Sequence, residues 1–182
     1  MKSVENSNLS KWDLRERIKS KEYERLPEET KNRLIVKEEL KPLDLVKNPI
    51  YIENTKGLKD IKENILEDLI IEQLSCFLGQ LGNDYAFIQR QYKVVMKGKD
   101  NYIDILLFNI EFNSYVVCEL KVREVRKQDF GQLKIYMNYV DDKVRKENHD
   151  LTLGLIICKK DDGVYAKYYP DDRIKVIEFK IF

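Results

Sequence analysis

Residues 102–121 read YIDILLF, NIEFNS and YVVCELK, two apolar runs of strand length separated by a segment of turn composition. β-Branched and aromatic residues dominate both runs, which is typical of β-strands. The pattern therefore predicts a β-hairpin with strands at residues 102–108 and 115–121. Because nearly every position of both runs is apolar, we expect both strands to lie inside a sheet that is covered on both faces.

Three charged residues interrupt this apolar hairpin, namely Asp104, Glu119 and Lys121. A charge in a buried strand is costly unless it is paired or binds a metal ion. Side chains alternate between the faces of a strand, so Glu119 and Lys121 share a face, and Asp104 joins them if it lies on that face of the neighbouring strand. Two adjacent carboxylates repel each other, and a hard cation such as Mg²⁺ or Mn²⁺ relieves that repulsion. A lysine beside them could hold an attacking water or stabilise charge on a phosphate, which is the chemistry of phosphodiester hydrolysis.

Further elements on both sides of the hairpin extend the sheet and cover it. Apolar residues at helical spacing predict one helix from residue 60 to about 81, before Gly82, and a second at residues 129–144. Strands are predicted at 87–97, 153–158, 164–169 and 175–182, with a turn at 98–101. This order predicts an α/β fold in which helices flank a central mixed β-sheet in the order αβββαβ.

Residues 1–57 differ from the rest of the chain. They are rich in Lys, Glu, Arg and Asn and contain Pro27, Pro42 and Pro49. They hold too few apolar residues for a core of their own. We expect residues 1–57 to form an N-terminal arm, either helical or partly mobile, and residues 58–182 to form the main domain.

Composition narrows the class of protein further. The 33 basic and 32 acidic residues give a net charge of +1, which leaves a nucleic-acid partner open because a local basic patch would be averaged away. The three cysteines lie in apolar runs and fit buried, reduced thiols, and the single histidine, His149, argues against a histidine-based triad or a zinc site. No apolar run reaches the roughly 18 residues of a membrane-spanning helix. The sequence therefore predicts a soluble, cytoplasmic protein without a membrane partner.

The charged hairpin resembles a known motif. Asp104 followed by Glu119-Leu120-Lys121 resembles the Asp…(Asp/Glu)-X-Lys signature of the PD-(D/E)XK nuclease superfamily. From about Leu58 to the C-terminus, the chain is similar to the C-terminal nuclease domain of the YhcG-like bacterial proteins. The similar segments are FIQRQY (87–92), YIDILLF (102–108), VCELK (117–121), GQLKIY (131–136) and GLIICK (154–159). The resemblance implies a restriction-endonuclease-like core, although the proline that often precedes the first motif aspartate is Ile103 here.

The resemblance also implies roles for the residues of the hairpin. Asp104 and Glu119 would ligate Mg²⁺ or Mn²⁺, and the backbone carbonyl of Leu120 would be a further ligand. Lys121 would position the attacking water.

Residues on the two predicted helices match further parts of the family pattern. Glu72 matches the acidic residue that many superfamily members bring to the metal, although Glu67 or Asp68 could take its place. Gln132 and Tyr136 match a Gln-X-X-X-Tyr motif, and their spacing of four residues puts both on one helix face.

Basic and polar residues near the hairpin could contact a polynucleotide backbone, or they could belong to an ordinary solvated surface. The candidates are Arg90, Gln91, Lys99, Arg123, Arg126 and Lys127.

The resemblance as a whole implies a Mg²⁺-dependent endodeoxyribonuclease that acts on DNA and forms a homodimer where both strands are cut. Two alternatives stay open. One is a nucleic-acid-binding or assembly module that keeps the fold but no longer cleaves, against which the intact Asp104, Glu119 and Lys121 set argues. The other is an RNA-directed nuclease, because the 2′-hydroxyl is recognised by contacts that the sequence does not place.

Overall fold

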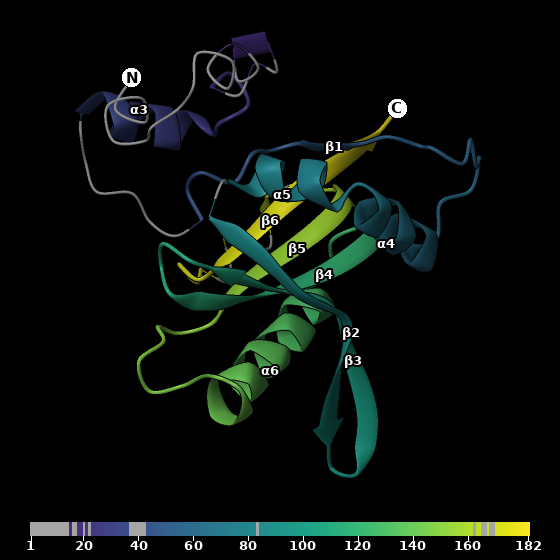
Figure 1. Cartoon of the computed structure of the whole chain (residues 1–182), viewed down its shortest axis with the longest axis vertical. Helices are drawn as coiled ribbons and strands as arrows, with labels where there is room; N and C mark the ends of the chain where they lie inside the picture. Colours follow the sequence, from purple (N-terminus) through teal and green to yellow (C-terminus); the bar gives the residue numbers. More distant parts are fainter. Residues whose placement is uncertain are drawn as a thin grey trace.

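A computed structural model of the chain describes residues 15, 18–19, 21, 23–36, 43–82, 84–161, 163–164, 167 and 170–182. A six-stranded mixed sheet forms its centre (Figure 1). In sheet order the strands are β1 (Ile50–Ile52), β6 (Ile174–Ile181), β5 (Leu153–Lys160), β4 (Ser114–Glu124), β3 (Lys99–Asn109) and β2 (Tyr85–Met96). The first four run parallel to one another, and β4, β3 and β2 are antiparallel. The predicted α/β fold with a mixed sheet is confirmed, as is the hairpin at its centre.

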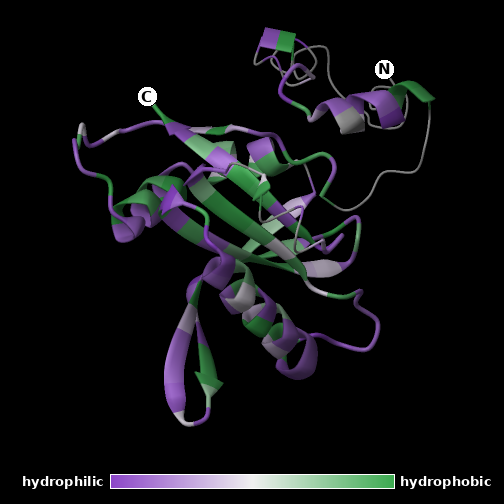
Figure 2. Ribbon diagram, turned by 180° about the vertical axis from the view of Figure 1, so that it is seen from behind, coloured by the Kyte–Doolittle hydropathy of each residue, from purple (hydrophilic) through white to green (hydrophobic). Residues whose placement is uncertain are grey.

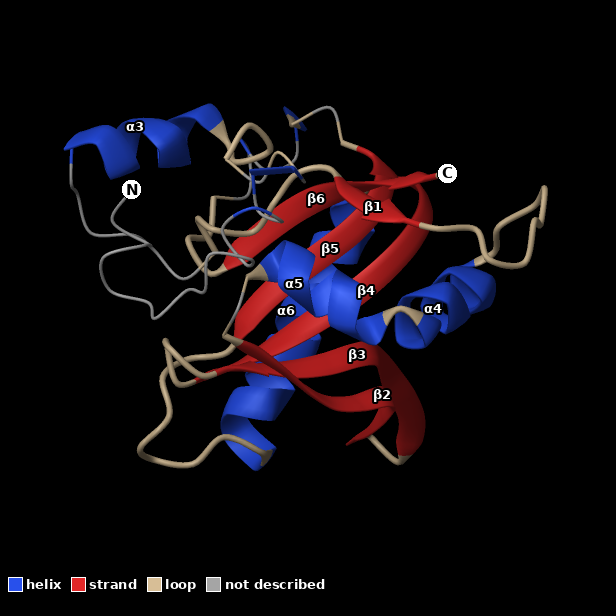
Figure 3. Cartoon of the chain, turned by 45° about the horizontal axis from the view of Figure 1, so that its top comes forward, coloured by secondary structure: helices blue, strands red, loops and turns tan. Residues whose placement is uncertain are grey.

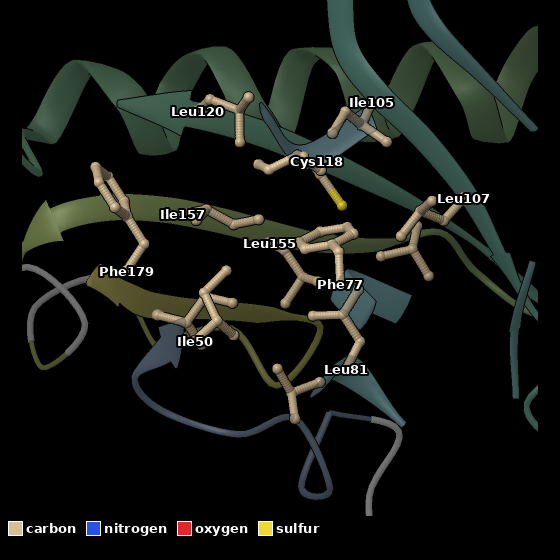
Figure 4. Packing of buried hydrophobic residues seen from close by; sticks show 14 of the residues in the cluster. Ile50, Phe77, Leu81, Ile105, Leu107, Cys118, Leu120, Leu155, Ile157 and Phe179 are labelled. Carbon is tan, nitrogen blue, oxygen red and sulfur yellow. The ribbon is translucent and has the colours of Figure 1, made fainter. Parts of the chain in front are cut away.

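Helices cover both faces of this sheet. Figure 3 shows α4 (Glu63–Glu72) and α5 (Leu74–Leu81) on one face and α6 (Lys127–Lys143) on the other. Alternate residues of β4 enter the two cores: Cys118 and Leu120 pack on the α4–α5 side, and Val117 packs on the α6 side. Figure 4 shows the first of these cores, in which Phe77 of α5 lies over the sheet. The apolar character of nearly every β4 position follows from this two-sided burial.

The predicted helix 60–81 is two helices, because the chain breaks at Gln73. The Gln73 side-chain amide accepts a hydrogen bond from the Glu53 N–H (3.0 Å) and donates one to the Glu53 carbonyl (2.7 Å). Seven residues later, Gln80 makes the same two bonds with the backbone of Tyr51, both at 2.7 Å. The break lets α4 contact β4 while α5 contacts β1 and β2. Apolar spacing continues through it, so the sequence pattern does not reveal it.

Strand β1 lies within the segment predicted to be an arm. It pairs in parallel with the end of β6, and Leu43, Val46, Ile50 and Ile52 are buried in the core on the α4–α5 side. Helix α3 (Glu28–Val36) adjoins this segment through a 2.9 Å hydrogen bond that the Thr30 hydroxyl donates to the Asp44 carbonyl. The boundary after residue 57 stays a prediction, but the packing of β1 favours an earlier one.

Three local predictions need correction. The turn before β3 consists of Lys97 and Gly98, whose φ values of 50° and 72° fit a two-residue type I′ turn, so residues 99–101 belong to β3. In the predicted strand 164–169, the described residues Val164 and Lys167 are helical, and the others lie outside the described residues. Cys76 is exposed, whereas Cys118 and Cys158 are buried thiols as expected. Among the described helices, none has the length and apolar character needed to cross a membrane.

Candidate active site

The candidate site lies where β3 and β4 separate. Their ladder ends at the pair Ile105–Cys118, and beyond it the Leu120 N–H donates to Asp104 Oδ2 at 2.8 Å instead of to a strand partner. Asp104 is the next residue beyond the end of this ladder, and its charge acts on the Glu119 carboxyl group. Lys121 Nζ lies 3.3 Å from Glu119 Oε2. The structure thus brings together the three charges that the sequence places in apolar strands.

Burial and mutual repulsion disfavour the ionised forms of the two carboxyl groups. Glu119 is 1% exposed, and its burial, together with the Asp104 charge, raises its pKa to about 8 although Lys121 opposes the shift. Burial likewise raises the pKa of Asp104, against the opposing Leu120 N–H and Lys121. Burial alone would lower the pKa of Lys121, but the charges of Glu119 and Asp104 outweigh it and the net shift is upward. One ammonium therefore does not compensate both carboxylates, and a further positive charge would stabilise them.

One carboxylate oxygen is suited to receive that charge. Glu119 Oε1 is buried and accepts no hydrogen bond from the residues that the structure describes, whereas Oε2 faces Lys121. A buried oxygen without a partner is rare in folded proteins. Across the described ranges, no three Asp, Glu, His or Cys side chains are grouped so as to hold a metal ion by themselves. Mg²⁺ is nonetheless commonly held by one or two carboxylates and keeps several waters, so Asp104 and Glu119 fit it.

Helix α6 turns Gln132 and Tyr136 toward these carboxylates. The Gln132 side-chain amide donates to the Tyr136 hydroxyl at 3.3 Å, and Tyr136 is buried. Burial raises the pKa of Tyr136, and the charges of Glu119 and Asp104 raise it further. Their spacing of four residues, about one helical turn, aligns the two side chains as expected.

Helix α4 does not bring Glu72 to the site. The Glu72 carboxylate is exposed, lies 2.8 Å from Lys56 Nζ and accepts a 3.1 Å hydrogen bond from the Thr55 hydroxyl. Glu67, by contrast, is 4% exposed and accepts a hydrogen bond from the Gln91 side-chain amide, which also reaches Asp104 Oδ1 at 3.4 Å. Five residues of α-helix separate the two glutamates by about 140° around the axis, so they point to different sides. Glu67 therefore replaces Glu72 as the candidate from this helix.

Gln91 links Glu67 to Asp104 through an unusual backbone. Its φ of 47° is left-handed in the middle of a strand, and a register shift between Phe87 and Gln89 precedes it. A non-glycine residue in this conformation is uncommon, and such strain is often found at functional sites. The sequence suggested Gln91 as a nucleic-acid contact, whereas the structure places its side chain between two carboxylates.

Sequence reasoning missed Glu63. It lies at the start of α4, and its charge contributes to the upward pKa shifts of Asp104 and Lys121. Glu63 precedes Glu67 by four residues, so both occupy one face of the helix. That spacing was the available signal.

Two of the predicted nucleic-acid contacts are engaged in ion pairs. Arg90 lies 2.9 Å from Glu67 Oε1 and 3.2 Å from Asp68 Oδ1. Arg123 makes two 2.8 Å hydrogen bonds to Asp129, which is buried at the start of α6. Both guanidinium groups therefore position carboxylates in this structure.

The other three basic candidates are exposed. Arg126 and Lys127 lie at the beginning of α6, and the Arg126 N–H donates to Asp129 Oδ2 at 2.8 Å. Lys99 lies away from the site, beside the turn between β2 and β3.

A mixed sheet between helices, with Asp104, Glu119 and Lys121 at the point where two strands separate, defines a restriction-endonuclease-like fold of the PD-(D/E)XK class. A family model described as the YhcG PDDEXK nuclease domain matches residues 43–181. The chain belongs to this family, and the resemblance inferred from its motifs is confirmed.

Known proteins similar to this chain are also nucleases by name. A curated protein of Escherichia coli (strain K12), named "Putative nuclease YhcG", is 25% identical over 127 residues, which cover 70% of this chain and 34% of that protein. The chain thus spans about a third of the length of this relative.

Solved structures with a similar fold include a repair endonuclease and a complex of EndoMS with DNA. The crystal structure of a repair endonuclease from Pyrococcus abyssi has a TM-score of 0.47 and 19% identity, covering 69% of this chain and 49% of that one. An EndoMS–dsDNA complex has a TM-score of 0.48 and 18% identity, covering 71% of this chain and 48% of that one.

Proposed function

We propose that this domain is a metal-dependent nuclease that hydrolyses phosphodiester bonds of DNA. The observation that carries the proposal is the buried Glu119 beside Lys121 and the partly buried Asp104, with Glu119 Oε1 lacking a hydrogen-bond partner among the described residues. Asp104, Glu119 and the Leu120 carbonyl would hold Mg²⁺ or Mn²⁺. When bound, the cation supplies positive charge against the phosphate and lowers the pKa of a water.

The protein's own groups would carry out the remaining work. Lys121, anchored by Glu119, would orient the attacking water and offset charge on the phosphate. Tyr136 and Gln132 would close the α6 side of the site and hold the substrate phosphate in place. Glu67, held by Gln91, would add a carboxylate from α4.

The choice of polymer rests on the family resemblance, which implies a deoxyribonuclease. The carboxylate and lysine set acts on the phosphodiester group, which DNA and RNA share, so RNA is the comparison substrate. A cytoplasmic location and, for cutting both strands of a duplex, a homodimer complete the proposal.

The test is cleavage of plasmid, linear and single-stranded DNA and of single-stranded RNA with Mg²⁺ or Mn²⁺. We expect the wild type to cut DNA, and Glu119→Ala and Lys121→Ala each to lose on the order of 100-fold in rate or more. Calorimetry with Mn²⁺ separates their roles: Glu119→Ala should lose binding, whereas Lys121→Ala, which keeps both carboxylates, should retain it. Cleavage of RNA alone would replace DNA as the substrate, and a wild type that neither binds Mn²⁺ nor cuts would refute the proposal.

A matched pair on α4 tests the assignment of Glu67. Glu67→Gln should weaken Mn²⁺ binding by roughly 10- to 100-fold, the usual effect of losing a supporting group at a metal site. Glu72→Gln makes the same chemical change on the exposed side of the helix and should alter binding by no more than about twofold. The reverse order of effects would restore Glu72 as the residue of the site.

A further inference from the structure

Strands β2 and β3 continue past the candidate site as a two-stranded ribbon. Pairing between β3 and β4 ends at Ile105, but pairing between β2 and β3 continues to Met96 and Lys99. Figure 1 shows this ribbon extending beyond the rest of the sheet. We define the ribbon as residues 91–104. Its base, Gln91 and Asp104, is part of the candidate active site.

The ribbon has one packed face and one exposed face. Val94 and Ile103 are fully buried in the core on the α6 side, and they fix the ribbon to the body of the protein. The residues next to them in sequence point to the other face, where Val95 is 49% exposed, Tyr102 is 44% exposed and the Lys93 side chain is 53% exposed. Figure 2 shows the mixed hydropathy of the ribbon, with a hydrophobic end of β2 beside a hydrophilic start of β3.

The exposed face leads directly to the catalytic carboxylate. Tyr102 lies two residues before Asp104 on β3, a distance of about 7 Å along the strand. Lys93 is the cross-strand partner of Tyr102, and its Nζ is held 2.8 Å from Asp100 Oδ2 on the same face. An accessible aromatic ring and an ammonium group thus stand side by side, next to Asp104.

A ring and a cation in this arrangement match the chemistry of an unpaired nucleotide. Aromatic side chains stack on bases that are free of a duplex, and lysines follow the phosphates of the same strand. Apart from Asp104 at its base, the ribbon carries three lysines against one aspartate, so this part of it attracts a polyanion although the whole chain has a net charge of only +1. Val95 extends the apolar surface beyond Tyr102.

We propose that the exposed face of the ribbon binds an unpaired nucleotide next to the phosphodiester that is cut: Tyr102 stacks on its base, and Lys93 contacts its phosphate. This inference rests on the proposed nuclease function of Asp104 and Glu119. It makes single-stranded DNA, or a locally unpaired stretch of duplex, the preferred substrate.

The test measures binding separately from cleavage. Anisotropy of a fluorescent single-stranded oligothymidylate, with a chelator present, reports affinity without strand cutting. We expect Tyr102→Ala to weaken binding roughly 5- to 150-fold and Tyr102→Phe to bind like the wild type. Lys93→Ala should reduce the slope of log affinity against log salt concentration by about 0.7, the value for one phosphate contact on a single strand.

Two controls make the result specific. Tyr51 and Lys180 form a similar cross-strand pair at the opposite edge of the sheet, so Tyr51→Ala and Lys180→Ala should bind like the wild type. An oligomer of abasic nucleotides offers no base, so it should bind the wild type no more tightly than it binds Tyr102→Ala. Circular dichroism confirms folding, which the half-exposed position of Tyr102 should preserve.

The inference would be overturned if the wild type and Tyr102→Ala bound the intact oligomer equally well. It would also be overturned if Tyr102→Ala lost as much affinity for the abasic oligomer as for the intact one. Absence of wild-type binding to the intact oligomer would do the same. A protein that shows the expected dependence on Tyr102 but cuts nothing with Mg²⁺ or Mn²⁺ would refute the nuclease proposal and leave the binding face standing. A protein that cuts, but whose DNA binding does not depend on Tyr102, would support the nuclease proposal and refute the binding face.

Discussion

Burial, repulsion by Asp104 and the ion pair with Lys121 all act on the carboxyl group of Glu119. Its pKa is raised to about 8, above the ordinary value of 4.5, because burial and the Asp104 charge outweigh the nearby Lys121. Burial raises the pKa of Asp104 and of Glu67 as well. In the absence of metal, the folded protein therefore holds a proton here at neutral pH that the unfolded chain has released. The proposed metal binding would displace that proton, which makes the metal affinity depend on pH.

A pH dependence of stability follows from this shift. Between pH 4.5 and about 8 the folded state binds more protons at Glu119 than the unfolded state, so the free energy of unfolding falls as pH rises through this window. We expect metal-free wild type to lose stability from pH 5 to pH 8 in urea denaturation with a chelator. Glu119→Gln should flatten most of that slope, and Glu72→Gln, on the exposed side of α4, should keep it. Parallel slopes in the wild type and Glu119→Gln would contradict this prediction.

At the scale of the elements, β1 depends on side chains outside its own ladder. It is a three-residue edge strand, and such strands leave backbone groups unpaired on their outer side. The Gln80 side-chain amide bonds both the N–H and the carbonyl of Tyr51, and the Gln73 side-chain amide bonds the same two groups of Glu53. The break between α4 and α5 thus places two amides along the outer edge of the sheet.

Removing one of these amides should loosen the edge strand. We expect Gln80→Ala to lower the free energy of unfolding by about 2 kcal/mol, because the buried amide is lost and two backbone groups of Tyr51 are left without partners. Gln89→Ala, at an exposed position of the opposite edge strand, is the matched control and should change stability by no more than about 0.5 kcal/mol. Equal midpoints in urea for the two variants would show that Gln80 does not hold β1.

For the whole molecule, residues 43–57 matter more than their composition suggests. Leu43, Val46, Ile50 and Ile52 are all less than 5% exposed and belong to the core under α5. Burying four such side chains contributes about 6–12 kcal/mol. The net stability of a domain is only about 5–15 kcal/mol, so losing them would remove most of it.

A pair of truncated chains tests this point. Residues 43–182 should unfold cooperatively on heating, because β1 and its core residues are retained. Residues 58–182 should show no cooperative transition at 25 °C or above, as followed by circular dichroism. A shared melting temperature for the two chains would support the sequence-based boundary after residue 57.

Much of the fold follows from local pattern alone. The two apolar runs at 102–108 and 115–121 identify a central hairpin because strands buried on both faces leave no polar alternation. The helix at α6 and the strand β5 follow from periodicity in the same way. The break at Gln73 and the pairing of β1 do not, since each depends on partners distant in sequence. A glutamine amide that bonds to backbone 20 or 29 residues away leaves no periodic signal.

The sequence by itself determined the class of the protein and its three central charges, because Asp104, Glu119 and Lys121 are conspicuous in strands that are otherwise apolar. Only the tertiary structure decided which helix residues join them. Glu67 and Glu72 are equivalent in sequence, and the rotation of α4 over the sheet buries one and exposes the other. The structure likewise decided the placement of Gln91 and Tyr102, because the left-handed backbone of Gln91 and the exposed face of the ribbon depend on how β2 and β3 pair.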